Sequence, residues 1–362
     1  MKIEIGSNFW ELALDSKRIK NFWWESDEYY KTYLKSGRNA FKAICKYLAI
    51  KNKRVIFPAY LCETETEPWY EEKWSVGYYP VEDDFSLDYK KLDSCILDFN
   101  PDIIIIQNYF GFETIDDECK KVLKRYQCQG AVIIEDITQS LLTDKKYEEA
   151  DYYVASFRKF FAIPDGGVLI SRKKIDTLEI ELSDPNIEVN AFQAYRLKQK
   201  YFNTGIPEIK KLFRDKYMKL NEQISINDKL YNMSDASKDI LRSINIEFIS
   251  SVRVRNYNYL YERLQEMDYI RTPLKLKDTD HIPLFCPVFI DNNEMRIKLR
   301  RYLASKDIYC PIIWQRPVNL KHKLQAVENI YNCILCFPID QRYDLEDMDR
   351  IVTTLKEWNI EK

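Results

Sequence analysis

The stretch "AVIIEDITQS" (131–140) places four apolar residues directly before two adjacent acids, Glu135 and Asp136. A short, continuous apolar run predicts a strand that is buried on both faces, as in a parallel sheet. A carboxylate at the end of such a strand is costly unless it faces a cation or a protonated ring nitrogen. The alternative is that Asp136 caps the N-terminus of a following helix.

Other strand-like segments lie on both sides of this stretch, and helix-like segments such as 39–50 and 116–127 separate several of them. The strand-like segments are "RVIFPAY" (54–60), "SVGYYPV" (75–81), "PDIIIIQNYF" (101–110), "ADYYVAS" (150–156) and "GGVLIS" (166–171). This alternation predicts an α/β fold with a mostly parallel sheet covered on both faces. Ligands bind at the carboxyl ends of the strands in such sheets.

The C-terminal part has a different pattern. A long helix is predicted over 246–266, followed by a strand, a helix, two strands (308–314 and 332–340) and a last helix. This order predicts a smaller α+β domain over 246–362. The large domain would then cover 1–245, with residues 1–35 as an N-terminal extension, and 176–245 polar and helical.

Composition narrows the class of protein. The chain has 362 residues with a formal net charge of −2, and its charges are interleaved, which argues against a nucleic-acid or anionic-membrane partner. Its start lacks the apolar region of a signal peptide and no apolar run could span a bilayer, so a cytoplasmic protein is expected. Nine dispersed cysteines and only two histidines, His281 and His322, argue against a disulfide framework and a zinc site. The pair in "CILC" (333–336) is predicted to be buried thiols.

Polar or aromatic residues follow several of the predicted strands or open helices near them. "SGRNA" (36–40) is a Ser-Gly turn that opens a helix, and its free N–H groups could hold a phosphate, although many ordinary helices also begin this way. Tyr60 could lie flat on a planar cofactor or could belong to the core.

Lys159 stands in "VASFRKFFAIPDGGVLIS" (154–171), 23 residues after Asp136. A lysine in an apolar setting is either a working amine or a surface residue. Gly166 and Gly167 would let the backbone turn tightly beside a ligand. A phosphate turn, a stacking aromatic, a carboxylate and an amine together point to pyridoxal 5′-phosphate (PLP), which needs all four.

The chain also resembles the DegT/DnrJ/EryC1/StrS sugar aminotransferases, which are PLP enzymes of the fold type I, or aspartate aminotransferase, class. The likeness follows the chain in order over most of its length, through "SGRNA" (36–40), "VIFPAYLCETETEP" (55–68), "VGYYPVEDDFSLD" (76–88), "IIIIQNYFGF" (103–112), "VIIEDITQSL" (132–141), "SFRKFFAIPDGGVLIS" (156–171) and "LCFPIDQRYDLEDMDRIV" (335–352).

The resemblance implies a role for each matching residue at the reacting end of the cofactor. Lys159 would be the catalytic lysine that binds the cofactor covalently. Asp136 would hold the pyridine nitrogen protonated, and Gln139 would hydrogen-bond the phenolic oxygen. Tyr60 would stack on the ring.

At the phosphate end, the resemblance implies contacts from the backbone N–H groups of Gly37 and Arg38 and from Ser156. It also implies a homodimer with shared active sites. The family has a segment that reaches the partner's phosphate, and "YNMSDAS" (231–237) is a candidate for it, which makes Asn232 a candidate contact.

The function implied is transfer of an amino group from an amino acid, expected to be L-glutamate, to the keto group of a nucleotide-linked sugar for surface polysaccharide or glycan biosynthesis. Trp314 and Arg316 are candidate substrate contacts, and "GSNFW" (6–10) either covers the mouth of the site or is an ordinary packed segment. Two alternatives stay open. One is a PLP enzyme acting on an amino acid or small amine, and the other is a PLP-fold protein that binds without turnover.

Overall fold

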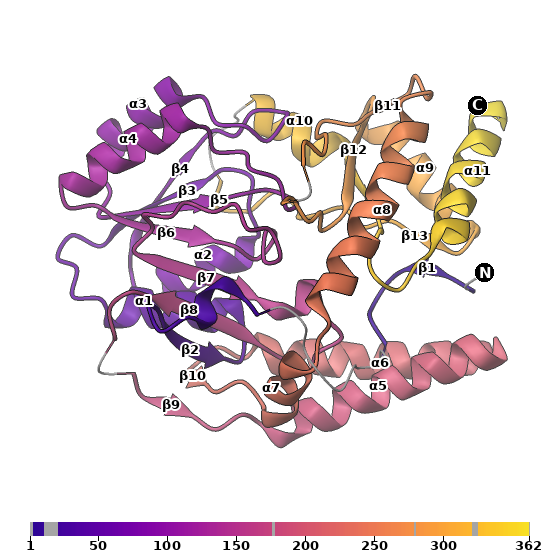
Figure 1. The fold of residues 1–362 in the computed structure, drawn as a ribbon, viewed down its shortest axis with the longest axis horizontal. Coiled ribbons are helices and arrows are strands. Elements are labelled where there is room, and N and C mark those ends of the chain that lie inside the picture. Colours follow the sequence, from indigo (N-terminus) through magenta and orange to yellow (C-terminus); the bar gives the residue numbers. More distant parts are fainter. Residues whose placement is uncertain (1–2, 11–20, 176–177, 279, 321–324, 362) are drawn as a thin grey trace.

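The computed structural model describes residues 3–10, 21–175, 178–278, 280–320 and 325–361. Its centre is a seven-stranded sheet with the order β2-β8-β7-β6-β5-β3-β4 (Figure 1). The strands are β2 (Tyr30–Leu34), β3 (Arg54–Pro58), β4 (Ser75–Tyr79), β5 (Ile103–Gln107), β6 (Val132–Asp136), β7 (Tyr152–Ser156) and β8 (Gly167–Ser171). The pairs from β4 to β7 are parallel, and β8 runs antiparallel to both of its neighbours. The predicted, mostly parallel sheet is therefore confirmed.

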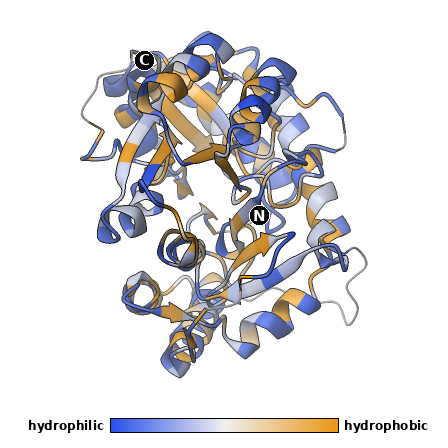
Figure 2. Cartoon of the chain, turned by 90° about the vertical axis from the view of Figure 1, so that its left-hand side faces the viewer, coloured by the Kyte–Doolittle hydropathy of each residue, from blue (hydrophilic) through white to orange (hydrophobic). Residues whose placement is uncertain are grey.

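Both faces of this sheet are buried. Successive residues of a strand point to opposite faces, and in β5 Ile103 and Ile105 pack in one apolar cluster while Ile104 and Ile106 pack in another. The first cluster includes side chains of α1 (Gly37–Tyr47) and α2 (Glu63–Glu71); the second includes side chains of α3 (Tyr89–Phe99) and α4 (Asp117–Cys128). In Figure 2 the strands are the most hydrophobic elements, with polar helix surfaces outside them. This arrangement explains why the strand sequences are continuously apolar.

Two long helices, α5 (Pro185–Thr204) and α6 (Pro207–Ser225), form an antiparallel pair along the lower edge in Figure 1. The side chain of Asp184 caps α5, proline occupies its first position, and Gly205 ends it with a φ of 66°. Short elements connect the pair to the rest of the chain: β9 (Ile180–Glu181), β10 (Leu230–Tyr231) and α7 (Asp235–Arg242). No helix within the described residues has both the length and the apolar character needed to cross a membrane.

The C-terminal part begins with α8 (Ile246–Leu264) and contains a separate antiparallel sheet with the order β11-β12-β14. Its elements after α8 are β11 (Ile270–Arg271), β12 (Cys286–Ile290), α9 (Asn293–Ser305), β13 (Ile308–Tyr309), α10 (Gln325–Cys333), β14 (Ile334–Phe337) and α11 (Leu345–Glu361). The predicted elements occur in the predicted order, and β11 and α10 are additions to it. The strand predicted over 308–314 was wrong beyond Tyr309, where Pro311 lacks an N–H for the ladder. A domain boundary between residues 245 and 246 stays a prediction.

The N-terminal segment crosses to this C-terminal part. Its strand β1 (Ile5–Gly6) pairs in parallel with β13, whereas the sequence predicts residues 1–35 as an extension of the large domain. The buried carboxylate of Glu4 lies 3.4 Å from Lys198 Nζ on α5 and 3.0 Å from Lys210 Nζ on α6. The segment therefore connects the α5–α6 pair with the C-terminal part. A short 3-10 helix, η1 (Trp23–Glu25), precedes β2.

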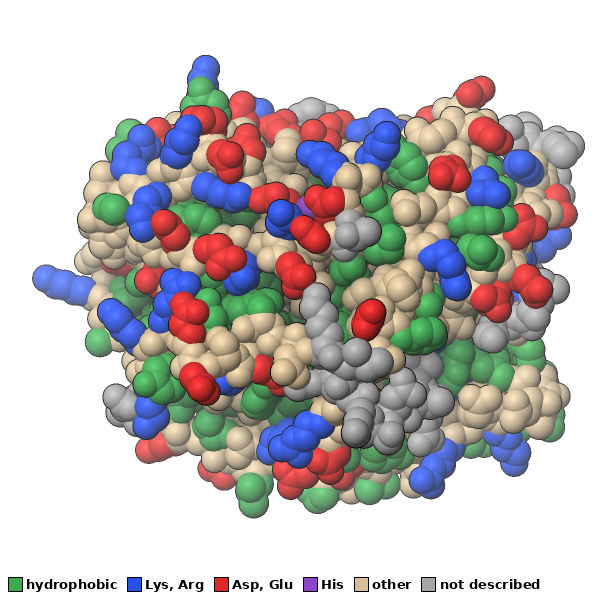
Figure 3. Space-filling model, in the orientation of Figure 1, with side chains coloured by type: hydrophobic (Ala, Val, Ile, Leu, Met, Phe, Trp, Pro, Cys, Tyr) green, Lys and Arg blue, Asp and Glu red, His purple; other side chains and the backbone are tan. Residues whose placement is uncertain are grey.

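The two cysteines of "CILC" are buried, as predicted, with Cys333 at the end of α10 and Cys336 in β14. Burial raises the pKa of both thiols. On the face drawn in Figure 3, positive and negative side chains are interspersed.

Candidate active site

A cavity of about 1000 Å³ lies between the seven-stranded sheet, the α5–α6 pair and the C-terminal part. Six of the seven predicted site residues line it: Gly37, Arg38, Asp136, Gln139, Ser156 and Lys159. The exception is Tyr60.

The sheet topology brings the acid and the amine together. Strands β6 and β7 are parallel neighbours, with Asp136 opposite Val154, so their carboxyl ends meet at the same edge of the sheet (Figure 1). Asp136 is the last residue of β6. Strand β7 ends at Ser156 and continues directly into a single 3-10 turn, η2 (Phe157–Lys159), which carries Lys159. The predicted placement of both residues at one edge is confirmed; their catalytic roles stay predictions.

Asp136 is buried, and its Oδ1 accepts a hydrogen bond from the N–H of Thr138 at 2.7 Å. Burial raises the pKa of this carboxyl to about 6, while the hydrogen bonds from Thr138 and the positive charge of Lys159 act in the opposite direction. Residues 138–142 form turns rather than a helix, so Asp136 closes a side-chain turn and the helix-cap alternative is wrong.

Glu65 is an acid of this site that the sequence analysis missed. It comes from α2, lines the cavity and is 8% exposed. Its Oε1 accepts the N–H of Cys62 at 3.3 Å, whereas its Oε2 is buried without a hydrogen-bond partner among the described residues. Burial, and then the charge of Asp136, raise the pKa of Glu65 well above its usual range. Two carboxyl groups thus share one buried environment beside Lys159, which favours a proton on one of them.

A backbone group from the loop after β5 holds the side chain of Gln139 in place. Its Oε1 accepts the N–H of Phe110 at 2.7 Å, and the side chain is buried at the cavity wall. Because the oxygen is engaged, the amide Nε2 is the group left to serve a ligand, and it can only donate. A donor suits a phenolic oxygen, the predicted contact.

Lys159 is exposed and lines the cavity. The aromatic residues around it in the sequence, Phe157 and Phe160, are fully buried in the core. The aromatic neighbours are therefore buried in the core while the lysine lines the open cavity, and its role as a working amine stays a prediction. An exposed amine still has access to a ligand there.

The N-terminus of α1 forms another part of the wall. Ser36 caps the helix by accepting the N–H of Asn39 at 3.2 Å, and the first turn of a helix leaves further N–H groups without intrahelical partners. A Cβ on Gly37 would lie 3.4 Å from the Cβ of Ser156, so the two predicted phosphate contacts are adjacent.

The two glycines after Lys159 have different local roles. Gly166 has a φ of +134°, and a Cβ on Gly167 would lie 2.3 Å from the carbonyl carbon of Ser36. Gly166 therefore has a backbone conformation that favours glycine, Gly167 makes room for the backbone at the start of α1, and a tight turn beside a ligand stays a prediction.

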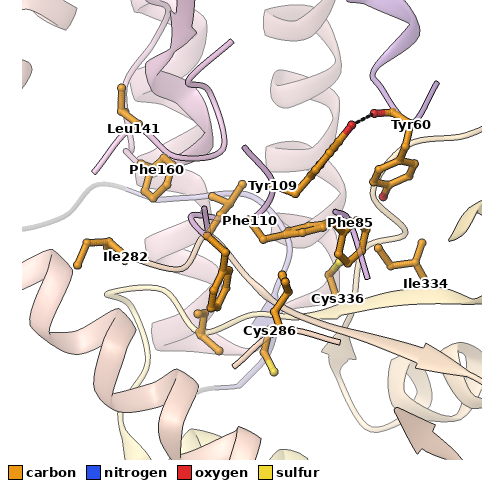
Figure 4. Close-up of a cluster of buried hydrophobic side chains, with 14 of the residues drawn as sticks. Tyr60, Phe85, Tyr109, Phe110, Leu141, Phe160, Ile282, Cys286, Ile334 and Cys336 are labelled. Atoms are coloured by element: carbon orange, nitrogen blue, oxygen red, sulfur yellow. Dashed lines mark hydrogen bonds between the residues drawn. The ribbon is translucent and has the colours of Figure 1, made fainter. Parts of the chain in front are cut away.

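Tyr60 lies in the core instead of the cavity wall. It is fully buried, its hydroxyl donates to the carbonyl of Ile313 at 2.6 Å, and its own carbonyl accepts the hydroxyl of Tyr109 at 2.6 Å (Figure 4). Its ring packs 5.0 Å from that of Trp314. Cys62, two residues further on, lines the cavity. The prediction that Tyr60 stacks on a cofactor is therefore corrected to the core alternative.

The other candidate contacts differ in whether they line the cavity. Trp314 lines the cavity, whereas Arg316 pairs with Glu328 at 2.5 Å outside the lining. Asn232 also lies outside it, and its N–H bonds the carbonyl of Glu181. Residues 6–9 of "GSNFW" line the cavity and Trp10 is buried, so this segment contributes to the wall.

Further lining residues come from elements far away in the sequence. Helices α5 and α6 contribute Tyr195, Tyr217 and Asn221, and α9 contributes Arg300 and Arg301. These arginines are exposed and have no carboxylate within ion-pair distance in the described part of the chain. In the sequence, Arg300 and Arg301 are visible as an adjacent basic pair in "RIKLRRYL" (296–303). That stretch does not indicate that they line the same cavity as Lys159.

Neither a protein-family model nor a curated protein matches the sequence. Solved structures, in contrast, do match this chain. DesV of S. venezuelae, in complex with a ketimine intermediate, is similar with a TM-score of 0.64 and 17% identity over 91% of this chain and 84% of that one. Spr1654 of Streptococcus pneumoniae, a putative sugar aminotransferase in its PMP form, has a TM-score of 0.65 and 16% identity over 90% and 85%.

PseC of Helicobacter pylori, an aminotransferase involved in the biosynthesis of pseudoaminic acid, has a TM-score of 0.64 and 11% identity over 91% of this chain and 86% of that one. At these identities the likeness establishes the fold. The chain has the fold of sugar aminotransferases, and the predicted fold type I class is confirmed.

Proposed function

We propose that the protein is a PLP-dependent aminotransferase that moves an amino group from an amino acid, L-glutamate, to the keto group of a nucleotide-linked sugar, for surface polysaccharide or glycan biosynthesis. One observation carries this proposal. Six residues predicted from the sequence line a single cavity, in a fold shared with solved sugar aminotransferases.

The residues of the cavity suit this cofactor. PLP, when bound, supplies an aldehyde that reacts with amines and a ring that withdraws electrons from the substrate carbon. The N–H groups at the start of α1 and Ser156 would hold the phosphate, and Gln139 Nε2 would donate to the phenolic oxygen. The one predicted cofactor contact that does not line the cavity is Tyr60, which lies in the core.

Asp136 would accept a hydrogen bond from the ring nitrogen. With a pKa of about 6, its carboxyl is mainly ionised at neutral pH, and an ionised carboxylate stabilises a protonated nitrogen. Burial strengthens this interaction because water does not screen it.

Lys159 would act through its Nζ. An amine that faces the cavity can take a proton from the substrate carbon and return it, which is general acid–base catalysis. Its exposure gives this amine free reach to a substrate, and Asp136 on the neighbouring strand end supplies a compensating charge.

The acceptor side of the cavity is basic and aromatic. Arg300 and Arg301 of α9 lack carboxylate partners in the described part of the chain, and arginine binds phosphate oxygens with paired N–H donors. Trp314 supplies an aromatic surface for stacking. These side chains support an acceptor that carries phosphates and a planar base, as a nucleotide-linked sugar does.

The resemblance also implies a homodimer, which we include in the proposal. The α5–α6 pair offers a candidate surface, because it exposes Val189, Leu212 and Met218 to solvent at 50%, 52% and 60%. Exposed apolar side chains on one pair of helices favour burial against a partner.

Near-visible absorption spectroscopy tests the proposal. The purified protein, incubated with PLP, is expected to develop an absorption band that shifts when L-glutamate is added. Lys159→Ala is expected to abolish both the band and the shift, since it removes the reacting amine. Lys211→Ala, an exposed lysine of α6, is the matched control and should behave like the wild type. A panel of nucleotide-linked ketosugars then identifies the acceptor.

Three outcomes would contradict the proposal. A protein that stays colourless with PLP does not use this cofactor. A band that forms but responds to no amino donor points to binding without turnover. Conversion of an amino acid or amine without transfer to any ketosugar points to another PLP reaction.

A further inference from the structure

Arg158 is an arginine of the cavity wall. It stands in η2, directly before Lys159, and its side chain is half-buried and lines the cavity. Its Nη2 donates to Asn221 Oδ1 on α6 at 2.9 Å. Within the described residues no carboxylate lies at ion-pair distance from it, so a partly desolvated positive charge has only a neutral amide as its partner.

A second arginine reaches the same face of α6. Arg38, the second residue of α1, donates from Nη1 to the carbonyl of Ser225 at 3.1 Å and pairs with Glu67 at 3.0 Å. Both guanidinium groups therefore bind α6, and both arginines line the cavity.

The start of α1 faces the same corner of the cavity. Gly37 is the first residue of that helix, and a Cβ on it would lie 3.4 Å from the Cβ of Ser156, two residues before Arg158. The first N–H groups of a helix carry partial positive charge and lack intrahelical acceptors. The corner therefore combines a hydroxyl, free N–H donors and two guanidinium groups.

We infer that Arg158 binds the phosphate group of the cofactor, so that this chain supplies a charged phosphate contact of its own beside Lys159. The inference rests on the proposed function, since it names a residue for the cofactor proposed there. Arginine fits the role because its planar donors match phosphate oxygens in pairs. Asn221 holds the guanidinium in place without neutralising it.

Comparing PLP with pyridoxal tests the inference, because pyridoxal has the same ring and aldehyde but no phosphate. Dissociation constants for both are measured by quenching of tryptophan fluorescence. Arg158→Gln is expected to weaken PLP binding by about 10- to 100-fold, the usual effect of losing a charged hydrogen bond, and to leave pyridoxal binding unchanged. Arg158→Lys, which keeps the charge, should bind PLP with an affinity between those of the wild type and Arg158→Gln.

Arg214→Gln is the matched control, since Arg214 is an exposed arginine of α6 outside the cavity, and it should leave both affinities unchanged. Equal weakening of PLP and pyridoxal by Arg158→Gln would overturn the inference by showing a role in local structure. Unchanged PLP binding with a lost response to L-glutamate would overturn it by assigning Arg158 to the substrate carboxylate. If the wild type binds neither compound, the proposed function fails and the inference falls with it.

Discussion

Glu135 and Asp136 are adjacent in the sequence, but their side chains leave strand β6 in opposite directions, as successive residues of a strand do. Asp136 lines the cavity. Glu135 is fully buried on the other side, where it accepts the N–H of Tyr147 at 2.7 Å and the amide of Asn108 at 3.0 Å. One acid is therefore available to a ligand, and the other connects strands and loops beneath the site.

Burial raises the pKa of Glu135 from 4.5 to about 7, although its two hydrogen bonds act against this shift. Between these values the folded protein binds more protons than the unfolded chain, so the free energy of unfolding should fall as pH rises from about 5 to about 7, by at most ~1.4 kcal/mol per pH unit. Glu135→Gln should remove this part of the pH dependence. Urea unfolding at several pH values measures it.

Glu148→Gln, an exposed glutamate of the loop after β6, is the control and should keep the wild-type pH dependence. The same slope of stability against pH in Glu135→Gln and the wild type would show that Glu135 does not titrate in this range.

The contact between α1 and β8 shows how two elements distant in sequence set the geometry of the site. The backbone of Ser36 and Gly37 occupies the space where a side chain of Gly167 would be. The N–H of Gly166 donates to the carbonyl of Lys35 at 2.7 Å, which fixes the two segments together. The N-terminus of α1 consequently lies at the same edge of the sheet as Lys159.

Gly167→Ala is expected to destabilise the protein by about 2–3 kcal/mol, because a Cβ 2.3 Å from backbone atoms forces the helix away from the strand. It should also weaken PLP binding by displacing the free N–H groups of α1. Urea unfolding and a PLP titration measure the two effects.

Gly130→Ala provides the comparison. Gly130 has a φ of +105° but no neighbouring atom within 4 Å of an added Cβ, so its cost should be limited to backbone strain of about 1 kcal/mol. If Gly167→Ala lowers the free energy of unfolding by no more than Gly130→Ala does, the close approach of α1 is not important for stability.

The molecule as a whole is assembled from segments that cross between its parts. The N-terminal strand β1 pairs with β13, while Glu4 beside it reaches Lys198 and Lys210 on the α5–α6 pair. The α5–α6 pair and the C-terminal part also enclose the cavity, together with the seven-stranded sheet. The shape of the site therefore depends on how these parts pack together.

If the exposed apolar side chains of α5–α6 form the dimer interface, Leu212→Glu should shift the protein from dimer to monomer, because a buried charge without a partner is costly. Sedimentation velocity measures the change. Leu97→Glu, at a leucine of α3 that is 69% exposed against 52% for Leu212, should leave the dimer intact. A wild type that sediments as a monomer, or a dimer that Leu212→Glu does not affect, would contradict this placement of the interface.

Much of the architecture was predictable from local patterns. Continuous apolar runs such as 103–106 predicted buried parallel strands, and the helices α1, α4, α6, α8, α9 and α11 followed from helical spacing. The position of Lys159 one turn after β7 placed it beside Asp136, because adjacent parallel strands end at the same edge. These features depend on the spacing of apolar residues and on the order of consecutive strands, and both can be read from the sequence.

Other features depend on contacts between distant segments. The sequence by itself determined the fold class and the edge of the sheet at which Asp136 and Lys159 meet, since burial pattern and strand order decide both. Only the tertiary structure decided that Cys62 rather than Tyr60 faces the cavity, that Glu65 lies near Asp136, and that Asn221 of α6 holds Arg158. The physical reason is that periodicity shows how deeply a residue is buried, whereas the packing of loops and distant helices decides what it touches.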